Sequence, residues 1–334
     1  MRSDETTSIA RRAKSWTCPV CRAAASRAVY RHPSGETLFA CTDCGAAFFP
    51  AQSEPVAERM GYWESPHGIS ANFEIYERPA VLAEAHRRYK LHLGDLEREL
   101  GRAGSLVDYG CGMGQFVEYA LRHGWEARGI DPSPEAVEYA QGRGRPVEVL
   151  AAEDDRLRGT SETVDAVALL NVLEHVEDPH RLLRRATSLL RRNGLLLVET
   201  PLWSFPMRRW ALAVARLTHG RLDAAQFFVY PEHRIYVTLS ALRQLLEAHG
   251  LQVVSKRRAV SSPSLILEKL RQVHRVRWWV RMAARGALLL ASLLGGNKLV
   301  VCARRSGSQM QTSQPSVSPG EADSLRRSSG RRFS

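Results

Sequence analysis

From Ser105 onward, short apolar runs alternate with segments in which apolar residues recur every three or four positions. Segments of the second kind, such as 116–122 and 239–249, are typical of amphipathic helices. Strands that alternate with such helices are typical of a parallel sheet with helices on both faces. The pattern therefore predicts an α/β domain over 105–305. Its seven expected strands are 106–109, 126–130, 147–150, 164–170, 195–198, 251–255 and 299–303.

The helices of this domain carry start and stop signals. Ser133 precedes Pro134 and Asp178 precedes Pro179, so that each capping side chain is followed by a proline at the first helical position. A glycine after the last apolar residue typically ends a helix, because it adopts the left-handed conformation without strain. We therefore expect the helix that begins at Asp178 to continue to Gly194.

The rest of the chain divides by composition. We expect a disordered N-terminus (1–15), a cysteine module (16–52), a helical connector (53–104) and a disordered Ser- and Arg-rich tail (306–334). Two insertions, 201–236 and 260–297, interrupt the α/β pattern. The first leaves from the end of an expected strand and is rich in aromatic residues. Because ligands of open α/β sheets bind beyond the strands' carboxyl ends, this insertion is the predicted lid over a substrate.

The cysteine module contains two Cys-x-x-Cys pairs with 19 residues between them. Each pair places two thiolates on one tight turn, and two such turns complete a tetrahedron around zinc. Four thiolates leave no open coordination position, so the predicted role of the metal is structural. Reduced, unligated cysteines and a redox motif are the alternatives, although a redox motif needs no second pair. The predicted zinc ligands are Cys18, Cys21, Cys41 and Cys44.

A glycine-rich loop follows the first expected strand and leads into a helix. Segment 108–114 reads Asp-Tyr-Gly-Cys-Gly-Met-Gly, and Asp131 ends the second expected strand. Glycines allow a close backbone approach to a ligand, and the helix N-terminus offers free N–H groups. A dinucleotide fingerprint would need a glycine where Gln115 stands. Asp131 is placed to accept hydrogen bonds from ribose hydroxyls. Alternatively, Asp108 caps only the turn and Asp131 only the following helix.

With these motifs the sequence resembles class I methyltransferases, most closely the ubiquinone-biosynthesis O-methyltransferase group. Segments 171–179 and 193–201 match that family as well, and the resemblance covers about 105–304. It implies a Rossmann-like fold and S-adenosylmethionine as cofactor. The glycine loop would hold the methionine part, Asp131 the ribose, and either Glu153 or Asp154 the adenine. The implied cofactor-binding residues are Asp108, Gly110, Cys111, Gly112, Gly114, Gln115, Asp131, Pro132, Glu153, Asp154, Asn171 and Val172.

Transfer of a methyl group to an acceptor needs a general base only where the acceptor does not readily lose its proton. Glu174 and His175 follow the fourth expected strand, and His233 lies at the end of the predicted lid. These three are the candidate catalytic residues, and a structural role is the alternative for either histidine. Some relatives that methylate the 2′-oxygen of small RNAs bind a divalent metal through Glu-x-x-Glu-His and a later histidine. Asn171 stands at the first of those positions here, which argues against a catalytic metal.

The formal net charge of +12 is dominated by arginines spread along the chain, and we interpret most of it as solvated surface. A small-molecule or glycan acceptor is the leading expectation. RNA docked by the zinc module and a non-catalytic binding role are the alternatives. Segment 278–296 would either contact a membrane surface or pack on its own domain. Paired cysteines and the absence of a visible signal peptide predict a cytoplasmic location.

Overall fold

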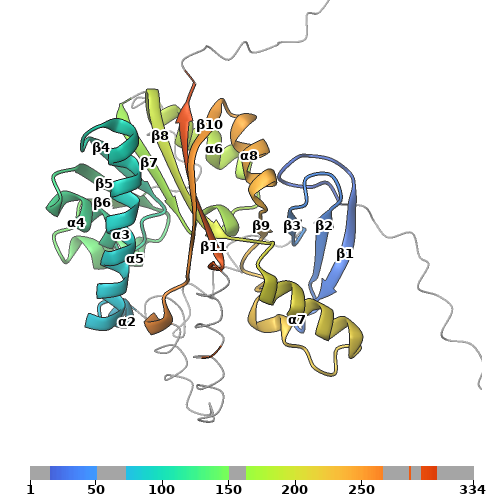
Figure 1. The fold of residues 1–334 in the computed structure, drawn as a ribbon. Coiled ribbons are helices and arrows are strands. Elements are labelled where there is room, and N and C mark those ends of the chain that lie inside the picture. Colours follow the sequence, from blue (N-terminus) through green and yellow to red (C-terminus); the bar gives the residue numbers. More distant parts are fainter. Residues whose placement is uncertain (1–15, 51–72, 150–162, 266–285, 287–294, 307–334) are drawn as a thin grey trace, which may run out of the picture.

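The computed structural model describes residues 16–50, 73–149, 163–265, 286 and 295–306 (Figure 1). They form a seven-stranded sheet with helices on both faces and a smaller four-stranded sheet beside it. The α/β class predicted from the alternating pattern is thus confirmed. The expectations for 1–15, for 53–72, for Glu153 and Asp154 and for nearly all of 306–334 lie outside the described residues.

The large sheet has the strand order β10-β11-β8-β7-β4-β5-β6. Neighbours from β8 to β6 pair in parallel, whereas β11 runs antiparallel to both β8 and β10. Strand order reverses beside β4, and open α/β sheets bind ligands at the carboxyl ends beside such a point. The strands are β4 (Ser105–Tyr109), β5 (Glu126–Asp131), β6 (Val147–Val149), β7 (Val164–Leu170), β8 (Leu190–Pro201), β10 (Leu251–Ala259) and β11 (Lys298–Arg305).

Both faces of this sheet are buried, because successive side chains point to opposite sides of a strand. On β7, Ala166 and Ala168 join the core under α3 and α4, whereas Val167 and Leu169 join the core under α6 and α8. The helices are α2 (Phe73–Tyr76), α3 (Pro79–Leu100), α4 (Gln115–Arg122), α5 (Pro134–Gln141), α6 (Pro179–Leu189), α7 (Pro206–Leu217) and α8 (Leu239–Glu247), with the short 3₁₀ turns η3 (Leu173–His175) and η4 (Ala225–Phe227).

Helix α3 belongs to the layer that covers the sheet. Tyr89, Leu93 and Leu96, at the helical spacing seen in the sequence, are buried against β4, β8 and α4. The helix ends at Gly101, whose φ of 78° is left-handed. Residues 79–100 of the expected connector are therefore part of the packed α/β core.

The helix that begins after Asp178 ends at Leu189, and β8 begins at the next residue. The expectation that it continues to Gly194 is therefore wrong. Gly194 lies inside β8, where a Cβ atom would stand 2.9 Å from the carbonyl oxygen of Arg191 and 3.1 Å from that of Asp165. Glycine is favoured both where two backbone segments approach closely and where a helix ends, so a glycine in the sequence does not distinguish the two cases.

The cysteine module supplies three strands of the small sheet, β1 (Ser26–Arg31), β2 (Thr37–Cys41) and β3 (Ala47–Phe48). The fourth strand, β9 (Ile235–Tyr236), comes from the segment predicted as a lid, and β3 and β9 pair antiparallel. Val20 and Phe48 of the module are also buried in the core that α6 and α8 form with the large sheet. The module is therefore packed onto the α/β domain.

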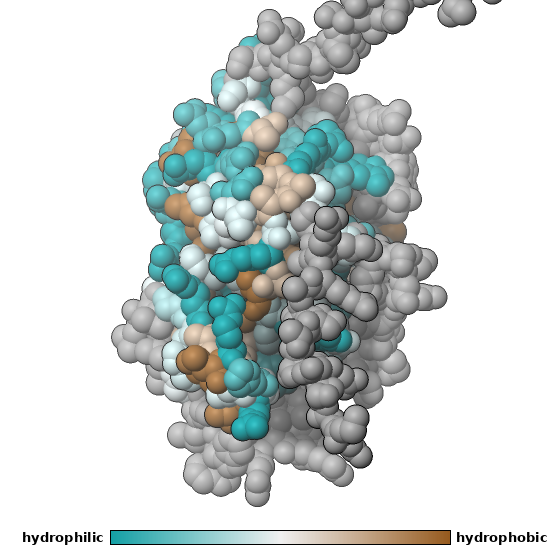
Figure 2. Space-filling model, turned by 90° about the vertical axis from the view of Figure 1, so that its right-hand side faces the viewer, coloured by the Kyte–Doolittle hydropathy of each residue, from teal (hydrophilic) through white to brown (hydrophobic). Residues whose placement is uncertain are grey.

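The surface on the module's side mixes polar and apolar side chains. Figure 2 shows scattered hydrophobic patches among hydrophilic ones on this face. Trp210, Leu217 and Leu222 are exposed apolar residues of α7 and the turn after it. In the part of the chain that the structure describes, no helix is long and apolar enough to cross a membrane. Most of 278–296, the predicted membrane contact, lies outside that part.

Candidate functional site

The glycine loop connects β4 to α4 at the carboxyl end of the sheet. Gly110, Gly112 and Gly114 have φ values of 80°, 51° and 68°, in the left-handed region that favours glycine. A Cβ atom would lie 2.5 Å from Cγ2 of Val172 at Gly110 and 2.7 Å from Cγ2 of Val147 at Gly114. At Gly112 it would meet no described atom within 4 Å. The loop is thus tightly packed at both ends and open in its middle.

Asp131, at the end of β5, holds this loop in place. Its Oδ2 accepts a hydrogen bond from the Gly112 backbone N at 2.7 Å, and its Oδ1 accepts one from the Ser133 backbone N at 2.9 Å. The side chain that caps α5 is that of Ser133, whose Oγ accepts from the Ala136 backbone N at 3.3 Å. Asp131 therefore does more than cap the following helix, and its carboxylate lies beside the open middle of the loop.

Asp108 lies under the loop and is 2% exposed. Its Oδ1 has no hydrogen-bond partner among the described residues. Burial, with the nearby carboxylate of Asp131, raises the pKa of Asp108 to about 8. A buried acid without a partner is unfavourable unless something else satisfies it.

Two predicted residues of the loop pack their side chains against neighbouring elements. The Cys111 thiol lies where a Cβ atom on Gly129 of β5 would approach it to 2.5 Å. The Gln115 amide is buried and donates to the carbonyl oxygen of Tyr76 in α2 at 3.1 Å. Pro132 is exposed. Cys111 and Gln115 thus contribute their backbone to the loop, while their side chains pack elsewhere.

Glu174, His175 and His233 come together beyond the ends of β7 and β8, although His233 is distant in the sequence. Their ligand-capable atoms all lie within 4.8 Å of one another, a set that could hold a metal ion. The two imidazole rings are 4.9 Å apart between centroids and meet edge to face. The structure therefore assembles the three residues that the sequence offered separately for acceptor chemistry.

The environment of this cluster determines its protonation. His175 Nδ1 lies 3.1 Å from the carbonyl oxygen of Glu232, so Nδ1 carries the proton and Nε2 keeps a lone pair. Burial lowers the pKa of His175 to about 4 and that of His233 well below its ordinary value. Burial raises the pKa of Glu174 to about 7. Near neutral pH both rings are therefore neutral, and Glu174 can hold or release a proton.

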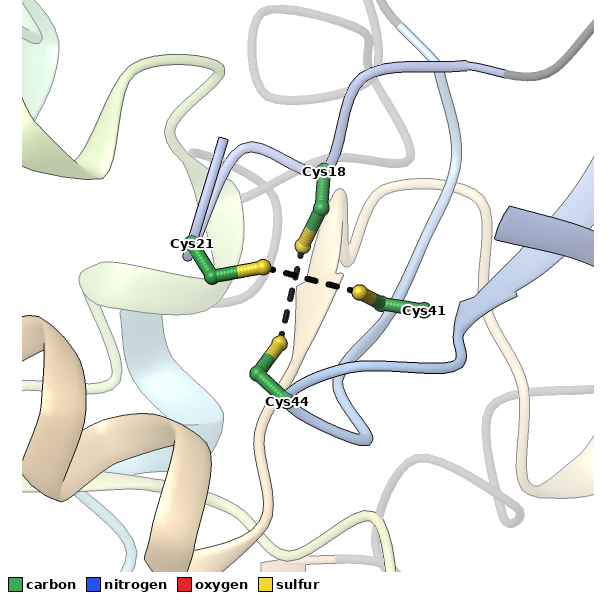
Figure 3. Close-up of side chains that lie close together, drawn as sticks. All are labelled: Cys18, Cys21, Cys41 and Cys44. Carbon is green, nitrogen blue, oxygen red and sulfur yellow. Dashed lines mark hydrogen bonds between the residues drawn. The ribbon is translucent and has the colours of Figure 1, made fainter. Parts of the chain in front are cut away.

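The four cysteines of the module direct their sulfurs toward one centre (Figure 3). The Sγ atoms of Cys18 and Cys44 are 3.7 Å apart, and those of Cys21 and Cys41 are 3.5 Å apart. All four are free of disulfides. Sulfurs that surround a tetrahedral zinc at ~2.3 Å are separated by ~3.8 Å. The donor type and the spacing both fit a Cys₄ zinc site.

A cavity of about 260 Å³ lies between the module and the segment that follows His233. Aromatic rings of Trp16, Phe48 and Phe49 line it, together with the charged side chains of Glu177 and Arg234. None of the residues that line this cavity belongs to the glycine loop or to the histidine cluster.

Sequence motifs missed a set of buried charged residues beside the glycine loop. Glu199 is fully buried at the end of β8, and Lys298 Nζ donates to its Oε1 at 2.8 Å. His92 Nε2 lies 2.9 Å and Arg88 Nε 3.8 Å from Glu199 Oε2. These residues stand singly at the ends of apolar runs or on an amphipathic helix. Their spacing in the sequence therefore does not indicate a shared site, and only the fold brings them together.

A family model described as "Methyltransferase domain" matches residues 81–256, more than half of the chain. A ubiquinone biosynthesis O-methyltransferase from Methylobacterium nodulans is 30% identical over 165 residues, which cover 48% of this chain and 64% of that protein. The enzyme of the same name from Azorhizobium caulinodans is 34% identical over 144 residues, which cover 41% and 56%. The matched region thus spans less than two thirds of these relatives' length.

Among solved structures, a 1,6-didemethyltoxoflavin-N1-methyltransferase from Burkholderia thailandensis is similar with a TM-score of 0.46 and 19% identity. That match covers 79% of this chain and 97% of the other. The resemblance to ubiquinone-biosynthesis methyltransferases expected from the motifs is confirmed by the sequence relatives. Since the family match includes the glycine loop, Asp131 and the turn at Asn171, the chain belongs to the methyltransferase domain family.

Proposed function

We propose that the protein transfers a methyl group from S-adenosylmethionine to a small-molecule or saccharide acceptor. The observation that carries this proposal is Asp108, a buried carboxyl whose Oδ1 has no partner among the described residues beneath an open glycine loop. Leaving such an atom unpaired costs about 1–3 kcal/mol. The ammonium group of the cofactor's methionine part is the kind of partner that would satisfy it.

The residues around the loop fit the cofactor. The open backbone at Gly112 leaves room for the methionine part, and Asp131 has acceptor sites beyond the two used by backbone amides for ribose hydroxyls. Asn171 and Val172 border the loop from the end of β7. When bound, S-adenosylmethionine would supply an electrophilic methyl carbon: a lone pair of the acceptor would bond to that carbon as its bond to sulfur breaks, and S-adenosylhomocysteine would be the leaving group.

On the acceptor side, the residues of the chain align the acceptor and manage its proton. We assign His175 Nε2 to accepting a hydrogen bond from the acceptor, because a group with a pKa of about 4 gains little by removing a proton from an alcohol. Glu174, with a pKa of about 7, suits the role of final proton acceptor. His233 completes the wall of the cluster.

The alternative role of the Glu174, His175 and His233 cluster is to bind a divalent metal ion. Asn171 does not favour it, because its Oδ1 already accepts a hydrogen bond from Lys298 Nζ at 2.6 Å. We expect methyl transfer to proceed unchanged after dialysis against a weak chelator that leaves the cysteine-bound metal in place. Activity that is lost on dialysis and restored by Mg²⁺ or Mn²⁺ would contradict the base assignment.

A small-molecule or saccharide acceptor is supported by the aromatic rings around His233. The ring centroids of Tyr230 and Tyr236 lie 5.5 Å and 5.6 Å from that of His233, and aromatic side chains typically line small-molecule sites. We propose zinc for the four cysteines, with a structural role, because four thiolates close the coordination shell.

The experiment that tests the proposal supplies radiolabelled S-adenosylmethionine and the purified protein to a fractionated cell extract. Label in the small-molecule or saccharide fractions is the expected result. Label in RNA would contradict the acceptor class but leave the cofactor assignment intact. If S-adenosylhomocysteine fails to bind in calorimetry, the protein is a non-catalytic member of its family. A variant with Asp131→Ala provides the matched inactive control.

A further inference from the structure

A buried polar network ends on the turn at Asn171. Lys298, the first residue of β11, donates from Nζ to Asn171 Oδ1 at 2.6 Å and to Glu199 Oε1 at 2.8 Å. Asn171 donates from its backbone N to the Glu199 carbonyl oxygen at 2.8 Å and from Nδ2 to Glu199 Oε1 at 3.3 Å. Both polar atoms of the Asn171 side chain are therefore held by residues of β8 and β11.

Glu199 is itself anchored from the opposite side. Arg257 Nη2 donates to His92 Nδ1 at 2.8 Å, which leaves the imidazole proton on Nε2, 2.9 Å from Glu199 Oε2. Arg257 Nε in turn donates to Asp95 Oδ2 at 2.6 Å. Burial would raise the pKa of Glu199, but Lys298 and Arg88 outweigh it and lower that pKa well below its ordinary value. Glu199 is thus a fixed, charged carboxylate that orients Lys298.

The turn that this network holds has an unusual backbone conformation. Asn171 has a φ of 59°, in the left-handed region, which asparagine adopts more often than most residues with a Cβ atom but less readily than glycine. Val172, the next residue, packs directly beneath Gly110, where a Cβ atom would lie 2.5 Å from Val172 Cγ2. The backbone conformation of Asn171 therefore sets the position of Val172, which packs against the glycine loop.

We propose that Lys298 is a positioning residue for the cofactor site: with Glu199 it holds Asn171 in the left-handed turn that supports the glycine loop through Val172. This inference rests on the proposed function. Lys298 is 127 residues from Asn171 in sequence and lies outside the residues matched by the family model. The last strand of the sheet would thereby take part in cofactor binding.

The test is a rescue experiment with S-adenosylhomocysteine as the probe. Lys298→Met removes both hydrogen bonds, and we expect the affinity measured by calorimetry to fall between about 5- and 30-fold. Adding Asn171→Gly should restore the affinity to within about twofold, because glycine adopts a positive φ without help from the network. Lys298→Arg keeps the charge, and we expect its affinity to lie between that of the wild type and that of Lys298→Met. Lys256→Met, at an exposed position on neighbouring β10, is the matched control.

Amide hydrogen exchange of the ligand-free protein gives a second readout. Lys298→Met should speed exchange in 108–115 and 171–173 selectively, and Asn171→Gly should reverse that change. Unchanged affinity and exchange in Lys298→Met, or a failed rescue, would overturn the proposal. Faster exchange throughout the sheet would overturn it too, since that indicates a general loss of stability. A wild-type protein that does not bind S-adenosylhomocysteine would contradict the proposed function alone, and exchange would still decide the role of Lys298.

Discussion

The carboxyls of Asp108 and Glu174 have raised pKa values for the same main reason, because burial penalises a charged carboxylate. Their surroundings differ. Asp108 has an oxygen under the glycine loop with no partner among the described residues, whereas Glu174 Oε2 lies 3.0 Å from Thr200 Oγ1 and belongs to the histidine cluster. One carboxyl is thus suited to binding a cation, and the other to exchanging a proton near neutral pH.

Cofactor binding should depend on pH through Asp108. Its pKa of about 8 means that below pH 8 the carboxyl must lose its proton before it can pair with the cofactor's ammonium group. We expect the affinity for S-adenosylhomocysteine to fall about tenfold per pH unit below that value. Calorimetry in buffers of different ionisation enthalpy should detect proton release. Asp108→Asn should bind more weakly, with a flat pH profile; an equally steep profile in that variant would assign the dependence to another group.

The rate of methyl transfer should depend on Glu174. With a pKa of about 7, the carboxylate form grows as pH rises, so kcat should increase about tenfold per unit up to pH 7 and then level off. Glu174→Gln should be slower and should lose this rise. Glu247→Gln, exposed on α8, serves as the control. A rise that persists in Glu174→Gln would exclude Glu174 as the base.

At the scale of elements, hydrophobic periodicity predicted every strand of the large sheet, with bounds that differ from the observed ones by up to five residues, at the start of β8. It could not predict β9, because two residues carry no periodic signal and β9 forms only by pairing with β3. The glycine loop, Asp131 and both cysteine pairs could be predicted because their spacing is local. The contacts of Lys298, Glu199 and His92 depend on three elements that meet only in the folded chain.

Two glycines in regular elements differ in how much room a Cβ atom would have. Gly194→Ala places a Cβ against backbone carbonyls in β8, and we expect the free energy of unfolding to fall by about 1–3 kcal/mol. Gly94→Ala lies inside α3 with no described atom within 4 Å, and should raise it by about 0.5–1 kcal/mol. Urea denaturation measures both. An equal change in the free energy of unfolding at the two sites would show that the backbone oxygens near Gly194 leave room for a Cβ atom.

At the scale of the whole molecule, the cysteine module and the α/β domain share a core and a small sheet. The module contacts the segment that carries His233, but it is not part of the glycine loop. Loss of the proposed zinc ion should therefore affect acceptor chemistry and stability more than cofactor binding.

Cys18→Ser tests this separation. We expect the protein to lose bound zinc and to unfold at a lower temperature, because the module's buried residues also pack against α6 and α8. Affinity for S-adenosylhomocysteine should stay within about twofold of the wild type, while methyl transfer falls at least about tenfold. Asp43→Asn, exposed between Cys41 and Cys44, controls for local change. Loss of cofactor affinity in Cys18→Ser would show that the two regions fold as one unit.

The position of β11 has a consequence for how the protein forms during synthesis. Of the strands that the structure describes, this one comes last in the sequence but lies inside the sheet, between β8 and β10. Until residues 298–305 leave the ribosome, β8 has an unpaired edge and β10 has no neighbour, a state in which strands pair with other chains. The parallel strands β4 to β8 can pair with one another before then, but β10 joins the sheet only through β11, so a nascent chain that stalls before Lys298 would expose the edge of β8.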